Sequence, residues 1–182
     1  MTQHPTLHTE GLVLRRMELT DLPNLVKFAS NKKVSDKVFG YPYPYLEEDA
    51  IARMNTVLEG FKNKNRFIFA ITQKGEEELI GEIGMRLETE HSKAEIGYWI
   101  AEPYWGKGIA SEAVAAILEF GFEELKINKL FATCFDGNDV SGKVLEKNGM
   151  VLEGVLKQEY FFKGEFRNSL QYRITRDEYM SS

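Results

Sequence analysis

The residues best suited to chemistry are two glycines, Gly106 and Gly108, which stand directly before a predicted helix in the run EPYWGKGIASEA. Because glycine has no β-carbon, both positions let the backbone adopt unusual dihedral angles and approach a ligand closely. The amides from Lys107 to Ser111 would form a first helical turn, whose N–H groups lack intrahelical acceptors. With the helix dipole behind them, these donors suit a phosphate or pyrophosphate, and Lys107 would add positive charge. A plain tight turn would use the same residues.

Strands and helices on either side must position this turn. Residue patterns predict strands at 12–17, 66–73, 79–88, 93–102 and 128–135, helices at 21–31, 46–63, 109–125 and 138–149, and a final hairpin over 150–175. The strands at 93–102 and 128–135 flank the long helix at 109–125, so we expect them to run parallel with a right-handed connection. This crossover is the only topological switch that we expect, and it contains the glycine turn. The turn matches neither a Walker loop nor a Rossmann fingerprint, since the required spacing and parallel context are missing.

Length and composition predict one domain over residues 1–182. Hydrophobic residues make up 43% and charged residues 28% of the chain, as in ordinary globular domains. The net charge of −5 argues against a nucleic-acid partner, and no apolar run approaches the roughly 18 residues that span a membrane. The N-terminus has no signal-peptide pattern, and the single cysteine, Cys134, is expected to be a buried core thiol. We therefore expect a cytoplasmic location.

Two longer runs, AEIGYWIAEPYWGKGIASEAV and GNDVSGKVLEKNGMVLEG, resemble the central motifs of the GNAT superfamily of N-acetyltransferases. The order of elements is also similar over nearly the whole chain, and the likeness is greatest to the branch that acetylates ribosomal proteins. The resemblance implies an α+β GNAT acyl-CoA N-acyltransferase fold. In this fold a mixed, mostly antiparallel, twisted sheet of about seven strands has helices on both faces, and the fourth and fifth strands splay apart.

The resemblance also implies acetyl-CoA as cosubstrate and no metal. Its pantetheine arm would pair with strand backbone near Trp99, Ile100 and Ala101, and its pyrophosphate would lie on the glycine turn. The implied cofactor-binding residues of that turn are Trp105, Gly106, Lys107, Gly108, Ile109, Ala110 and Ser111. Trp105 stands where the superfamily usually has Gln or Arg, which removes a side-chain contact and leaves the backbone donors. Asn138 would contact pantetheine, cap the next helix, or do both, and Ser141 would lie near the thioester sulfur.

Amine acetylation needs a neutral amine, a polarised thioester carbonyl and a proton for the departing thiolate. Ser141 is the first candidate for the leaving-group acid, with Tyr160 in reserve. Glu95 and Glu159 are the candidate bases, because both stand on strands expected at the cleft, although each would also be an ordinary half-exposed strand carboxylate. Period-two alternation places Glu95 on one face with Gly97 and Trp99. The three histidines are poorly placed for catalysis and form no metal motif.

The resemblance therefore implies an enzyme that transfers an acetyl group to a primary amine by direct attack in a ternary complex. The first hypothesis for the acceptor is the N-terminal α-amino group of a ribosomal protein. A small amine, such as a polyamine or an aminoglycoside, is a second acceptor hypothesis, and a non-catalytic acyl-CoA sensor is a third function. Aromatic residues of the 31–46 loop and the final hairpin would line the acceptor mouth or form core and rim. A homodimer is compatible with the sequence.

Overall fold

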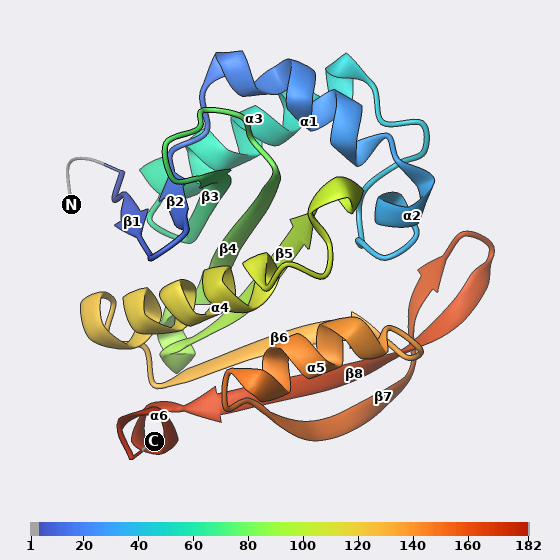
Figure 1. Ribbon diagram of the computed structural model, residues 1–182. Coiled ribbons are helices and arrows are strands. Elements are labelled where there is room, and N and C mark those ends of the chain that lie inside the picture. Colours follow the sequence, from blue (N-terminus) through green and yellow to red (C-terminus); the bar gives the residue numbers. More distant parts are fainter. Residues whose placement is uncertain (1–3, 182) are drawn as a thin grey trace.

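The computed structural model describes residues 4–181, which form one mixed eight-stranded sheet covered by helices on both faces (Figure 1). The strands in chain order are β1 (Leu7–His8), β2 (Leu12–Arg15), β3 (Arg66–Gln73), β4 (Gly81–Glu88), β5 (Lys93–Ile100), β6 (Lys129–Phe135), β7 (Val151–Phe162) and β8 (Glu165–Thr175). Their order across the sheet is β1-β2-β3-β4-β5-β6-β8-β7. All neighbouring pairs are antiparallel except β5–β6, which is parallel as predicted.

The expected α+β fold with a mostly antiparallel sheet is confirmed, with eight strands instead of about seven. The additional strand is β1, which has two residues and pairs antiparallel with β2. A segment this short cannot show a period-two pattern, so the sequence carries no signal for it.

Helices α1 (Leu22–Ala29), α2 (Lys32–Ser35) and α3 (Glu47–Lys62) cover one face of the sheet, and α4 (Ile109–Glu119) and α5 (Asp139–Lys147) cover the other (Figure 1). The short helix α6 (Arg176–Met180) follows β8. Tighter turns occur at η1 (Leu19–Asp21), η2 (Thr89–His91) and η3 (Glu102–Tyr104), and a π-helical turn, η4 (Phe120–Glu124), extends α4. The predicted helix at 21–31 ends at Ala29, and Asn31 caps the separate helix α2, accepting a hydrogen bond of 2.9 Å from the Lys33 amide. No helix within residues 4–181 is long and apolar enough to cross a bilayer.

Strand alternation divides the core into two clusters, one on each face of the sheet. Ile83, Met85 and Ile96 point toward α4 and belong to the larger cluster. Ile68 and Trp99 point toward α1 and α3 and belong to the smaller one. Neighbouring residues of β5 therefore face opposite layers of the protein, and this alternation determines which side chains meet at the site described below.

The parallel pair β5–β6 is joined over only part of its length. Lys93 to Ile96 pair with Lys129 to Ala132, whereas β5 continues to Ile100 and β6 to Phe135 with no pairing between them. The two strands therefore separate toward their carboxyl ends, as the resemblance implied. Both helices that follow these strands, α4 and α5, begin at this open end (Figure 1).

Two facing glycines should respond differently to the same substitution. Gly84 on β4 and Gly97 on β5 are cross-strand partners. A β-carbon on Gly84 would lie 2.4 Å from the Phe67 carbonyl oxygen, whereas one on Gly97 would have no atom within 4 Å. We expect Gly84→Ala to lower the free energy of unfolding by about 1–3 kcal/mol because β3 must move. Gly97→Ala, the matched control, should change it by less than about 0.5 kcal/mol. Equal losses in equilibrium urea unfolding would contradict this interpretation.

Candidate active site

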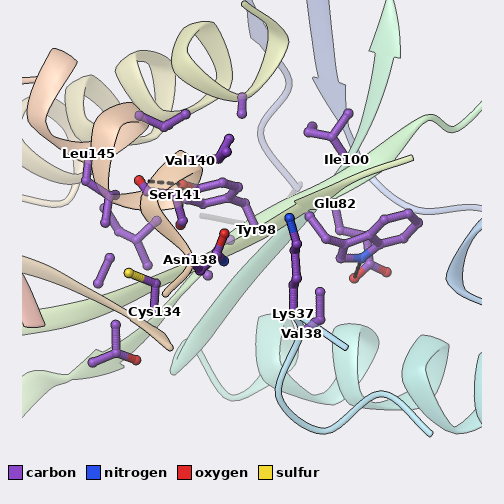
Figure 2. Close-up of a pocket in the computed structure, with 18 of the residues that line it drawn as sticks. Lys37, Val38, Glu82, Tyr98, Ile100, Cys134, Asn138, Val140, Ser141 and Leu145 are labelled. Atoms are coloured by element: carbon purple, nitrogen blue, oxygen red, sulfur yellow. Dashed lines mark hydrogen bonds between the residues drawn. The ribbon is translucent and has the colours of Figure 1, made fainter. Parts of the chain in front are cut away.

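A cleft of about 810 Å³ occupies the region where β5 and β6 separate, and it reaches both faces of the sheet (Figure 2). On the α4–α5 face it is lined by the glycine turn and by Tyr98 and Ser141. On the α1–α3 face it is lined by Glu82, Glu95 and neighbouring residues. Figure 2 shows Tyr98 and Ser141 on one side of the strand and Glu82 on the other. The cleft thus passes through the sheet and offers two halves for two ligands.

The glycine turn lies at the mouth of the first half. Gly106 and Gly108 have φ angles of 75° and 80°, the left-handed region that favours glycine, and a β-carbon on either would meet no atom within 4 Å. Gly108 is the N-cap of α4, and its carbonyl accepts the first helical hydrogen bond, from Glu112. The preceding amides of the first turn have no intrahelical acceptor, so this end of α4 presents donors and positive dipole to an anion. Lys107 does not line the cleft, and its ammonium lies 5.2 Å from the centre of the Tyr104 ring.

The free edge of β5 exposes the backbone of alternate residues. The Ala101 amide donates to the Ile80 carbonyl at 2.8 Å, on the side of β4. Because strand backbone groups alternate in direction, the Trp99 amide also faces β4, and the amides of Tyr98 and Ile100 face the gap toward β6. Of the three residues predicted to offer backbone to pantetheine, only Ile100 is oriented to do so. Trp105 packs against this edge, and its indole N–H donates to the Ile100 carbonyl at 2.6 Å.

Tyr98 and Ser141 are joined inside the first half. Their hydroxyl oxygens lie 2.8 Å apart and share a hydrogen bond. Burial raises the pKa of Tyr98 to about 12, against the opposing effect of this hydrogen bond, so the phenol stays protonated. Tyr98 was not among the predicted site residues, although the alternation that groups Glu95 with Trp99 also places Tyr98 on the opposite face, beneath α5. Burial likewise raises the pKa of the neighbouring Cys134 thiol, which is buried as predicted and lines the cleft.

Asn138 occupies the N-cap position of α5, but its side chain makes no capping hydrogen bond. Its backbone carbonyl accepts from the Ser141 amide at 3.0 Å, which completes the first turn of the helix. The side chain instead lines the cleft beside Ser141 (Figure 2). Of the two roles considered for Asn138, helix cap and ligand contact, this geometry offers only the second.

The second half of the cleft contains a buried carboxylate that the sequence analysis did not single out. Glu82 is 1% exposed, and its Oε2 accepts hydrogen bonds from the Tyr41 hydroxyl at 2.6 Å, from Arg53 at 2.9 and 3.0 Å, and from the Trp99 indole at 3.2 Å. Burial and the Glu82 charge raise the pKa of Tyr41 well above its ordinary value, so its hydroxyl remains a donor. A lone glutamate inside the apolar run LIGEIGM was the available signal.

Glu95 also lines this half, and both of its oxygens are hydrogen-bonded. Oε2 accepts from Arg86 at 2.7 Å, and Oε1 accepts from the Thr133 hydroxyl at 3.2 Å. Glu159 is exposed and does not line the cleft. Tyr160 does not line it either, because its ring packs against Phe39 with centres 4.6 Å apart.

A β-bulge in β7 explains the positions of Glu159 and Tyr160. The register shifts between Leu156 and Tyr160, and Gln158 adopts a φ of 52°. The Gln158 amide donates to the Asn168 side-chain oxygen at 2.9 Å, so Asn168 holds the bulge in place. The bulge directs Tyr160 toward the 31–46 loop and leaves Glu159 in solvent.

Of the predicted site residues, most line the cleft and four lie outside it. The following line the cleft: Glu95, Trp99, Ile100, Trp105, Gly106, Gly108, Ile109, Ala110, Ser111, Asn138 and Ser141. Outside it lie Ala101, Lys107, Glu159 and Tyr160. Within the described part of the chain, no group of three or more His, Cys, Asp or Glu residues is arranged to hold a metal ion.

The charged groups that line the cleft are mostly basic. The acidic ones are Glu82 and Glu95, and the basic ones are Lys37, Arg53, Arg66, Arg86, Lys143 and Lys147. Both carboxylates form ion pairs, with Arg53 and Arg86 respectively. The remaining positive charge favours a polyanionic ligand somewhere in the cleft.

Comparisons with known proteins agree with this geometry. Residues 11–151 match the family described as acetyltransferase (GNAT) domain. The chain is 34% identical over 178 residues to the uncharacterized N-acetyltransferase p20 of Bacillus licheniformis, covering 96% of this chain and 98% of that protein. A GNAT-family acetyltransferase structure from Bacillus anthracis superposes with a TM-score of 0.85 at 28% identity, covering 95% of this chain and 99% of the other.

Relatives named for their acceptors are of two kinds. The ribosomal-protein-serine acetyltransferase of Escherichia coli (strain K12) is 37% identical over 92 residues, half of this chain and 51% of that protein. The spermidine N(1)-acetyltransferase of the same strain is 25% identical over 178 residues, 97% of this chain and 91% of that protein. The match to the family, the full-length relative and the fold together show that the chain belongs to the GNAT family of acetyltransferases.

Proposed function

We propose that this acetyltransferase acetylates the α-amino group at the N-terminus of a protein, as the ribosomal-protein branch does, by direct attack in a ternary complex. The observation that carries the proposal is the charge of the cleft. Its carboxylates, Glu82 and Glu95, are both paired with arginines, and further basic residues surround them. A polyamine carries several positive charges and would be repelled by such a lining, whereas a peptide N-terminus brings only one.

Acetyl-CoA, the acetyl donor of this family, fits the first half of the cleft. Amides at the start of α4 would hold the pyrophosphate, since Gly106 and Gly108 leave space there that a β-carbon would fill. The Ile100 amide faces the gap between β5 and β6 and would donate to the pantetheine arm or to the thioester carbonyl. Lys143 and Lys147 line the same cleft and would balance the phosphate charge. When bound, this cosubstrate supplies the activated thioester.

Ser141 and Tyr98 would act on the departing sulfur as a pair. Ser141 would pass its hydroxyl proton to the sulfur, directly or through water, and regain through solvent the proton that the acceptor nitrogen releases, while Tyr98 holds the serine at 2.8 Å. Tyr98, with a pKa of about 12, retains its proton beside a thiolate, because an ordinary thiol has a pKa of about 8.5. The pair would therefore stabilise developing negative charge by hydrogen bonding, with no ionisation of the tyrosine.

The α-amino group suits this cleft, because the described residues that line it include no histidine and its two carboxylates are both paired with arginines. Its reference pKa is about 8, so a useful fraction is already neutral near pH 7. A lysine or polyamine amine, with a reference pKa above about 10, would need a stronger base.

The first prediction concerns the glycine turn. Gly108→Val should weaken CoA binding at least about tenfold, because its side chain would fill the space before the first-turn amides. Gly75→Val is the matched control, since Gly75 has a φ of 87°, open space around its β-carbon position and no contact with the cleft. Both variants carry similar backbone strain. An equal loss of CoA affinity in calorimetry would therefore assign the effect to strain and contradict the proposed binding of the pyrophosphate at the glycine turn.

The second prediction concerns the Ser141–Tyr98 pair. Ser141→Ala should lower kcat roughly 100-fold. Tyr98→Phe, which keeps the serine but removes the hydrogen bond that orients it, should lower kcat about tenfold. CoA affinity should change less than about twofold in both variants. Because Tyr98, with a pKa of about 12, stays protonated up to about pH 10, wild-type kcat/KM should rise through the pKa of the acceptor amine and show no decline up to that pH. Wild-type turnover by Ser141→Ala would remove the serine from the mechanism.

The third prediction concerns the acceptor. Thiol release from acetyl-CoA should be measured with peptides that begin with Ser or Ala, with spermidine and with an aminoglycoside. We expect kcat/KM for the best peptide to exceed that for spermidine at least about tenfold. The control peptide carries a blocked N-terminus and an internal lysine, which separates α- from ε-amine acetylation. Preference for spermidine would support a polyamine enzyme, and turnover on no acceptor would support an acyl-CoA sensor.

A further inference from the structure

The second half of the cleft contains a carboxylate oxygen without a partner. Among residues 4–181, Glu82 Oε1 is the buried side-chain oxygen that receives no hydrogen bond. The other oxygen, Oε2, receives all four of the contacts from Tyr41, Arg53 and Trp99. One end of the carboxylate is thus saturated and held in place, while the other has its lone pairs free.

The missing partner must be a hydrogen-bond donor, because an ionised carboxylate has only acceptor sites. The protein groups nearest in the network cannot supply it. The Tyr41 hydroxyl and the Trp99 indole both donate to Oε2, and Arg53 directs two N–H groups to the same oxygen. A ligand that approaches Oε1 with N–H groups and positive charge would complete the carboxylate.

The space beside Glu82 is suited to a small amine. Glu82 stands opposite Trp99 in the β4–β5 pair, and the next cross-strand pair on this face is Gly84 with Gly97. A β-carbon on Gly97 would have no atom within 4 Å, so no side chain packs on the sheet at this position, which lines the cleft. Two residues along a strand span about 7 Å, which is the spacing between the Gly84–Gly97 pair and the Glu82–Trp99 pair. A small amine that lies over Gly97 would therefore reach Glu82. Gly97 is also adjacent in sequence to Tyr98, which faces the first half of the cleft, where acetyl-CoA would bind.

We propose that Glu82 Oε1 accepts a hydrogen bond from the ammonium group of the acceptor, and that it is the acceptor-binding residue of this enzyme. The inference rests on the proposed function and specifies how the amine is recognised. It selects an acceptor whose primary amine enters protonated, with N–H groups to donate, and this amine loses one proton to solvent water before its nitrogen attacks the thioester. Glu95 is the weaker candidate, because each of its oxygens already accepts a hydrogen bond, from Arg86 or Thr133.

Glu82→Gln provides a sharp test because the network determines how the amide must lie. The four donors on the Oε2 side require the glutamine oxygen there, which places its NH₂ group where Oε1 was. The variant keeps the contacts of Tyr41, Arg53 and Trp99 and converts the free acceptor into a donor that repels an ammonium. We expect KM for the best peptide acceptor to rise at least about tenfold, with kcat changed less than about threefold and CoA affinity unchanged.

Two control variants separate recognition from structure. Glu88→Gln removes a carboxylate from the same strand outside the cleft, where Glu88 pairs with Lys93, and should leave all constants unchanged. Tyr41→Phe removes one donor to Oε2 and leaves Oε1 in place, so it should raise the acceptor KM less than Glu82→Gln. An equal effect from Tyr41→Phe, or an unchanged KM in Glu82→Gln, would overturn the proposal.

A binding measurement needs no turnover, and its wild-type arm needs no variant. Thermal unfolding of the CoA-loaded protein is followed with n-propylammonium chloride, with propyltrimethylammonium chloride and with sodium chloride at equal ionic strength. We expect n-propylammonium alone to raise Tm, because the quaternary ion has the charge and no N–H donor, and Glu82→Gln to abolish the rise. This rise without turnover on any acceptor would support the inference and contradict the proposed function. Turnover with no such rise would contradict the inference and leave the function standing.

Discussion

The site depends on the short pairing of β5 with β6, the only parallel strands among residues 4–181. β5 and β6 are joined over residues 93–96 and 129–132, and each then continues alone. A parallel pair requires a crossover, here α4, which must begin where β5 ends. α5 follows β6 and begins at the same end for the same reason. Two helix N-termini and an unpaired strand edge therefore meet at one gap, the arrangement by which open α/β sheets bind ligands at a topological switch point.

The alternation of β5 converts this gap into two chemically different half-sites. Tyr98 points toward α5 and meets Ser141, while Trp99 points toward α3 and meets Glu82. The first half presents backbone donors and neutral hydroxyls, which suit a thioester with phosphates. The second half presents a carboxylate held by buried donors, which suits a cation. Each set includes one of two adjacent residues of β5, Tyr98 or Trp99. The two half-sites therefore lie next to each other on one strand, with no hinge between them.

The last hairpin packs against the 31–46 loop, and no residue of β7 or β8 lines the cleft. The bulge at Gln158 and the Asn168 side chain direct Tyr160 onto Phe39 and leave Glu159 exposed. Lys163 and Asp36 form an ion pair between the same hairpin and loop. These contacts join two segments more than 120 residues apart, and one of them holds Phe39, which lines the cleft.

The sequence by itself determined the order of elements, the parallel crossover, the glycine turn and the family, because these depend on local patterns and short spacings. It also predicted that Ser141 and the Ile100 backbone lie at the cleft. Only the tertiary structure decided that Tyr98 holds Ser141, that Glu82 lies buried with one free oxygen, and that Ala101 and Lys107 turn away. The hydrogen bonds concerned join residues 17 to 58 positions apart, such as Trp99 to Glu82 and to Tyr41. Side-chain direction at such distances depends on strand register and bulges, and a single residue of shift moves a side chain to the other face of the sheet.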